Sequence, residues 1–174
     1  MKTVILTFNP NGTYHCHGLP GAALPLYIDG LRQAGCHTCP EFARCTMSSW
    51  SKDAAGITDL EALEAASKEL GFEWVKAGSA RGWGGALRPA PYVIRIAKAK
   101  FDIAVTPSKD GQTYELATDW HGNWMAQHVG DKYGKLLQHY GVHKAGNYAR
   151  KMGKIVTRTF IPQSNTVKLH ITGY

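Results

Sequence analysis

Alternating apolar and polar positions at the N-terminus predict the first element of the chain. Val4, Leu6 and Phe8 occupy every second position, which is the period of a strand with one buried face. Residues 9–12 have the composition of a turn and residues 13–17 are again strand-like, so the segment predicts a hairpin. The apolar spacing of residues 22–34 then predicts a helix that ends at a glycine.

The pattern changes after residue 45. Residues 46–57 are mostly small and polar and indicate a linker. Thr58 and Glu61 have the spacing of a capping box, which predicts a helix over residues 58–70. Residues 78–91 are rich in glycine and proline and favour an irregular loop.

The remaining residues, 92–174, have strand and helix periods in turn. Strands are expected at 92–97, 101–106, 113–118, 155–161 and 166–172, and helices at 125–140 and 144–152. The order αβββαββ predicts an α+β fold, with an antiparallel sheet and helices on one face. The predicted organisation is a hairpin–helix unit at 1–45, a linker at 46–57 and an α+β domain at 58–174.

Charge is distributed unevenly along the chain. The net charge is +7, yet residues 1–75 hold five Lys/Arg against eight Asp/Glu, which gives −3. From residue 132 to the end there are eight Lys/Arg and no acid. A field of one sign favours an acidic partner, which is nucleic acid, a nucleotide or an acidic protein face, although a solvated basic surface without a ligand is the alternative. The candidate contacts are Lys132, Lys135, Lys144, Arg150, Lys151, Lys154 and Arg158.

The segment of residues 81–88 places cations and an aromatic ring on a glycine-rich backbone. Arg81 and Trp83 together are suited to stack on an unpaired base, with Arg88 to contact a phosphate. The alternative is a glycine linker whose tryptophan packs on the sheet.

Asp119 and His121 are the strongest candidates for acid–base chemistry. On an extended strand, residues two apart share a face, and Glu115 would join them there. A carboxylate–imidazole pair is able to act as a general base, but no Ser or Cys nucleophile is placed by a motif. A strand end with a structural turn is the more ordinary interpretation, so no catalytic residue is assigned.

All four cysteines fall in the first 45 residues, as Cys16, Cys36, Cys39 and Cys45. The C-x-x-C turn with two further thiols predicts a closed metal site that holds zinc, with His15, His17 and His37 as reserve ligands. The same thiolates could hold a 4Fe–4S cluster, or remain without metal or as disulfides. The N-terminal apolar run is too short for a signal peptide and no run has membrane-spanning length, so we expect a reducing cytoplasm.

Several short motifs carry a resemblance to known families. These are residues 57–63, Leu70-Gly71-Phe72, Val93-Ile94-Arg95, Phe101-Asp102-Ile103, Tyr114-Glu115-Leu116, Asp119-Trp120 with Gly122, and Lys132-Tyr133. Residues 57–174 resemble an uncharacterised family of cyanobacterial, plastid and phage genomes. Residues 2–35 resemble a second small family, a strand–turn–strand–helix unit often encoded beside the first.

The resemblance implies a cellular role but no particular reaction. Genes of the first family tend to neighbour an AAA-type ATPase, which implies a non-enzymatic accessory or adaptor protein, and no catalytic residues carry over. The chain departs from the pattern at His121, where a second Trp is usual, and in the additional loop from Cys36 to Cys45. The alternative function is an iron–sulfur protein with a redox or catalytic role.

Overall fold

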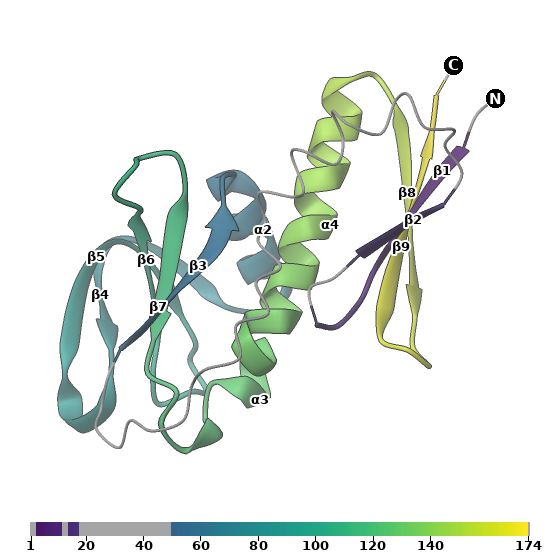
Figure 1. The fold of residues 1–174 in the computed structure, drawn as a ribbon. Coiled ribbons are helices and arrows are strands. Elements are labelled where there is room, and N and C mark those ends of the chain that lie inside the picture. Colours follow the sequence, from purple (N-terminus) through teal and green to yellow (C-terminus); the bar gives the residue numbers. More distant parts are fainter. Residues whose placement is uncertain (1–2, 12–13, 18–49, 174) are drawn as a thin grey trace.

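Two antiparallel sheets lie on either side of one long helix in the computed structural model, which describes residues 3–11, 14–17 and 50–173 (Figure 1). The terminal sheet has the order β2-β1-β9-β8 and the central sheet has the order β3-β7-β6-β5-β4. The strands are β1 (Thr3–Phe8), β2 (Tyr14–His17), β3 (Ser51–Ile57), β4 (Glu73–Arg81), β5 (Leu87–Arg95), β6 (Ile103–Pro107), β7 (Tyr114–Thr118), β8 (Ile155–Ile161) and β9 (Thr166–Thr172). The helices are α2 (Leu60–Glu69), α3 (Ala126–Val129) and α4 (Gly134–Lys151), with short 3-10 turns η1 (Trp83–Gly85), η2 (His121–Asn123) and η3 (Asp131–Tyr133).

The terminal sheet joins the two ends of the chain. β1 pairs with β9 without interruption, from Thr3 opposite Thr172 to Phe8 opposite Val167. Leu6 and Phe8 of β1, with Val167, Leu169 and Ile171 of β9, are buried against the C-terminal half of α4. The predicted N-terminal unit and the predicted C-terminal domain therefore share one sheet.

The central sheet packs on α2 and the N-terminal half of α4. Ile57, Leu63, Ile103 and Leu116 are fully buried in this core. The α2 helix begins one residue later than the capping box predicts, because Asp59 caps it by accepting a hydrogen bond from the Ala62 amide at 3.0 Å.

The α2 cap is also held from α4. The Tyr140 hydroxyl accepts hydrogen bonds from the amides of Thr58 at 3.0 Å and Asp59 at 3.3 Å. These bonds satisfy donors just before the start of α2 and fix where that helix meets α4.

Two segments predicted to be irregular are strands. The predicted linker is wrong for residues 51–57, which form β3 and pair with β7 through a bulge. The predicted loop of residues 78–91 is mostly the long β4–β5 hairpin, and only residues 82–86 form its turn. Small residues occur in this hairpin because it is closely packed: a Cβ on Gly78 would lie 3.1 Å from Cγ1 of Val75.

The helices are divided differently from the prediction. The predicted helix 125–140 is divided into α3, η3 and the start of α4, because Lys132 and Tyr133 have φ of +46° and +63° and the chain turns before α4 begins. The predicted break before residue 144 is absent from α4, where Gly141 continues the helix. Its hydrogen faces Phe8, whose Cε1 would lie 2.9 Å from an added Cβ, so this glycine permits close packing rather than ending the helix.

The α+β class and the antiparallel pairing are confirmed, with two sheets in place of one. The strands β8 and β9 have the predicted bounds. The predicted helix at 22–34 lies outside the described residues. Within the part of the chain that the structure describes, no helix is long and apolar enough to cross a membrane.

Candidate functional site

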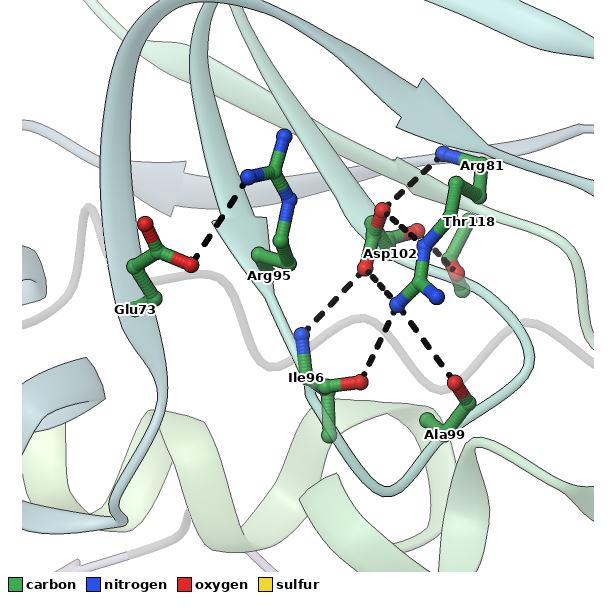
Figure 2. A network of polar contacts seen from close by, with 7 residues as sticks. All are labelled: Glu73, Arg81, Arg95, Ile96, Ala99, Asp102 and Thr118. Carbon is green, nitrogen blue, oxygen red and sulfur yellow. Dashed lines mark hydrogen bonds and ion pairs between the residues drawn. The ribbon is translucent and has the colours of Figure 1, made fainter.

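A buried aspartate organises one end of the central sheet (Figure 2). Asp102 has no solvent exposure, and its carboxylate accepts two hydrogen bonds of 2.8 Å from the Arg81 guanidinium. The same carboxylate accepts from the backbone amides of Arg81 at 3.1 Å and Ile96 at 3.2 Å. The bidentate pair raises the pKa of Arg81 and gives this predicted nucleic-acid contact a structural role within the protein.

Arg81 also fixes the turn after β5. Its Nη2 donates to the carbonyl oxygens of Ile96 at 3.1 Å and Ala99 at 3.4 Å. This turn continues into Lys100, and Arg81 itself is two residues before Trp83. One guanidinium thus positions both the hairpin turn and the turn that holds Lys100.

A second buried carboxylate connects the hairpin to the loop after β7. Asp119 is 3% exposed and accepts hydrogen bonds from the backbone amides of Trp83 at 3.2 Å and His121 at 3.0 Å. The predicted carboxylate–imidazole pair is wrong in its geometry, because β7 ends at Thr118 and His121 lies in η2. Asp119 accepts its hydrogen bond from the His121 backbone amide and not from the imidazole, so its role is structural.

These two carboxylates support an exposed group of rings, which we call the aromatic surface: Trp83, His121, Trp124 and Lys100. The ring centroids of Trp83 and His121 are 4.0 Å apart, and Lys100 Nζ is 4.0 Å from the Trp124 centroid. Trp83 and Trp124 remain 44% and 39% exposed. Large aromatic side chains usually bury more of their area than this, and the cation beside them adds attraction for an anionic aromatic ligand.

Gly122 holds Trp124 in place. Its φ of +66° is favourable for glycine alone, and a Cβ there would be 2.5 Å from the Trp124 indole nitrogen. The indole therefore lies over the bare backbone of η2.

The predicted basic residues do not form one patch. Several are bound within the protein: Lys144 donates to the Thr58 hydroxyl at 2.7 Å, and the Arg88 guanidinium lies 5.5 Å from the Trp50 ring centre. Exposed cations occur at both ends of α4, with Lys132 and Lys135 at its start, Arg150 and Lys151 in its last turn, and the half-buried Lys154 beyond it. A helix of this length separates the two groups by about 27 Å.

Sequence analysis missed a polar cluster between α2, α4 and β8. Glu69 Oε1 lies 2.6 Å from Arg158 Nη2, and Glu69 Oε2 lies 2.7 Å from His143 Nε2. His139 Nδ1 is 3.2 Å from Oε1 but is not aligned for a hydrogen bond. The i, i+4 spacing of His139 and His143 was visible in the sequence, but their acidic partner is 70 residues away and gives no local signal.

The cluster has shifted pKa values. Burial raises the pKa of Glu69, but hydrogen bonds from Arg158 and His143 outweigh burial and lower it from 4.5 to about 2. Burial lowers the pKa of His139, although the charge of Glu69 opposes this. Among the described residues, no group of His, Cys, Asp and Glu is arranged to hold a metal ion, and this cluster is no exception.

We predict that this cluster makes stability sensitive to acid. The pKa of Glu69 is depressed on folding, so its contribution is complete above about pH 4.5 and is lost as the pH falls toward 2. Glu69→Gln should lower the free energy of unfolding by about 1–2 kcal/mol at pH 7, after allowance for partial exposure, and by less at pH 2.5. Urea titrations across this range measure it. Glu64→Gln, which removes an exposed pair with Lys68 on the same helix, is the matched control, and an equal pH dependence in both variants would contradict the prediction.

The predicted metal site lies largely outside the described residues. Cys36, Cys39 and Cys45 are in that part of the chain, and Cys16 is in β2, opposite Leu6 of β1. A thiolate site for zinc or a 4Fe–4S cluster stays a prediction.

The fold and the aromatic surface define an α+β protein in which buried carboxylates present exposed rings at one end of a sheet. The chain belongs to a family described as protein of unknown function (DUF1257), which it matches over residues 66–169, more than half of its length. The aromatic surface lies inside the matched range and all four cysteines lie outside it. No curated protein and no solved structure matches the chain.

Proposed function

We propose that this protein is a non-enzymatic accessory protein that binds single-stranded nucleic acid on its aromatic surface. The observation that carries the proposal is the exposure of two indoles, Trp83 against His121 and Trp124 against Lys100. Aromatic rings that are exposed and rigidly held stack on unpaired bases, and a neighbouring ammonium contacts phosphate. The buried Asp102 and Asp119 support this role because they fix the two turns before a ligand arrives.

The rest of the chemistry at this surface favours binding over catalysis. Asp119 is occupied by two backbone amides, and the His121 ring packs at a tilt of 41° against Trp83 rather than pairing with the Asp119 carboxylate. The chain-wide charge of +7 adds a non-specific attraction for a polyanion. The exposed Lys132 and Lys135 extend this attraction at the start of α4.

We predict that Trp83→Ala and Trp124→Ala each weaken the binding of a fluorescein-labelled oligothymidylate. Loss of one stacked base costs about 1–3 kcal/mol, which is roughly 5- to 150-fold in affinity. Fluorescence anisotropy at fixed salt measures the change. Phe160→Ala removes an equally exposed ring from β8, far from the aromatic surface in sequence, and should leave the affinity unchanged.

Salt dependence separates stacking from charge in the same experiment. Lys100→Ala should make the plot of log affinity against log salt shallower by about 0.7, the amount expected for one phosphate contact on a single strand. Trp83→Ala should lower affinity without changing that slope. The proposal would be refuted if Phe160→Ala weakened binding as much as the tryptophan variants do. It would also be refuted if Trp83→Ala, Trp124→Ala and Lys100→Ala all left the affinity unchanged.

Two further parts of the proposal concern partners and metal. The resemblance to a family encoded beside an AAA-type ATPase, and of residues 2–35 to a second small family, supports a role beside such an ATPase in the cytoplasm. The four cysteines favour a structural thiolate site for zinc, with a redox-active 4Fe–4S cluster as the alternative. Elemental analysis of protein purified without a tag distinguishes zinc from iron.

A further inference from the structure

The outer strand of the terminal sheet, β8, is an unprotected edge. Its register with β9 is continuous from Ile155 opposite Thr172 to Ile161 opposite Thr166, without a bulge. It contains no proline, and Ile155 and Phe160 are 50% and 52% exposed. Its single charge, Arg158, is bound by Glu69 at 2.6 Å. A long, regular and neutral edge is a template for pairing with another strand.

The other three sheet edges in the described part of the chain are protected. β2 is only four residues long. β3 is interrupted by a bulge between Asp53 and Ile57. β4 carries Glu73 and Lys76, and Ala77 distorts its backbone with φ of +51°. Short strands, bulges and charges are the ways in which proteins prevent unwanted strand pairing, so β8 is the exception among the four edges.

The charged residues around β8 indicate which charge a strand that pairs with β8 would carry. Arg150, Lys151 and Lys154 lie at the end of α4 and immediately before the strand, and Lys168 is opposite Thr159 on β9. The chain has no Asp or Glu from residue 132 to its end. Two copies of β8 would bring these cations together, whereas an acidic strand would be attracted to them.

We propose that β8 accepts an extended, acidic peptide segment of a partner protein, which adds a fifth strand to the terminal sheet. Main-chain hydrogen bonds to β8 give affinity. Apolar side chains of the peptide contact Phe160 on the face of the sheet that packs on α4, and its carboxylates lie on the other face, which carries Ile155 and Lys168. This site is separate from the aromatic surface, and the proposal does not depend on nucleic-acid binding.

The test uses the full-length protein and a fluorescein-labelled peptide of the same length as β8 that alternates valine and glutamate. We expect saturable binding by fluorescence anisotropy. The double variant Ile155→Lys/Phe160→Lys should bind at least about tenfold more weakly, even though it adds two positive charges. Leu87→Lys adds a charge at an exposed apolar position on β5, which is not a sheet edge, and should bind as the unmodified protein does.

Four outcomes decide the proposal. Weaker binding by the double variant, with loss of binding when every peptide amide is N-methylated, supports strand addition. Tighter binding by the double variant would show attraction by charge alone and overturn it. A dimer that sedimentation detects in the unmodified protein but not in the double variant would assign β8 to a second copy of this chain. An oligothymidylate that loses affinity in the double variant would assign β8 to nucleic acid, and either assignment overturns the proposal.

Discussion

Replacement of Asp102 by alanine is expected to lower the free energy of unfolding by about 3 kcal/mol. The carboxylate is fully buried and accepts from the Arg81 guanidinium and from the amides of Arg81 and Ile96. Removal of one partner of such a pair leaves the other charge and the amides without acceptors, which costs about 3–5 kcal/mol in buried sites. The lower end applies because the Arg81 side chain is 42% exposed. Chemical denaturation monitored by circular dichroism measures the change.

Glu73, which is also drawn in Figure 2, provides the matched control for Asp102. Glu73 lies 3.7 Å from Arg95 on the exposed side of the hairpin. Glu73→Ala should change stability by less than about 1 kcal/mol, because an exposed ion pair contributes little. Equal losses in the two variants would contradict the structural role that we assign to Asp102.

Gln138→Leu is expected to lower the free energy of unfolding by about 2 kcal/mol. Gln138 is 2% exposed on α4, and its Nε2 donates to the carbonyl oxygens of Phe8 at 2.9 Å and Asn165 at 2.8 Å. These carbonyls end β1 and precede β9, so one amide attaches both strands to the helix. Leucine fills a similar volume but removes the donor of both hydrogen bonds, at about 1 kcal/mol or more each.

Hydrogen exchange locates the effect of Gln138→Leu. Amides of β1 and β9 should exchange faster in this variant, while those of β6 and β7 in the central sheet keep their protection. Gln127→Leu makes the same chemical change at an exposed position of α3 and should alter neither sheet. Faster exchange across both sheets would show that Gln138 supports the whole fold rather than the attachment of the terminal sheet.

Local pattern predicted much of the secondary structure. β9 alternates regularly, and the bounds predicted for β8 and β9 agree with the structure because β9 buries one face on α4 and pairs with β8 along its whole length. The β4–β5 hairpin was missed because its inward positions hold glycine and alanine, which resemble a loop in composition. The pairing of distant strands was not predictable either, since β1 pairs with β9, which lies at the other end of the chain.

The sequence predicted several residues of the candidate site but not the role of each one. The sequence singled out Arg81, Trp83, Asp119 and His121, and all four lie at the same end of the central sheet. The roles differ from the predicted ones because the Arg81 guanidinium donates to the buried Asp102, and because backbone amides donate to the Asp119 carboxylate. Asp102 is 21 residues from Arg81 and Asp119 is 36 residues from Trp83, so spacing alone could not assign these two contacts. Trp124 and Lys100 were missed because their contact depends on two separate turns.

Photo-cross-linking to an oligonucleotide that contains 5-iodouracil is the most direct test of the aromatic surface. The halogenated base reacts with aromatic side chains on which it stacks, and mass spectrometry identifies the attached residue. The account predicts cross-links at Trp83 and Trp124, and their loss in the corresponding alanine variants. Cross-links only at Phe160 or Tyr148, or none at an oligonucleotide concentration that saturates binding, would contradict it.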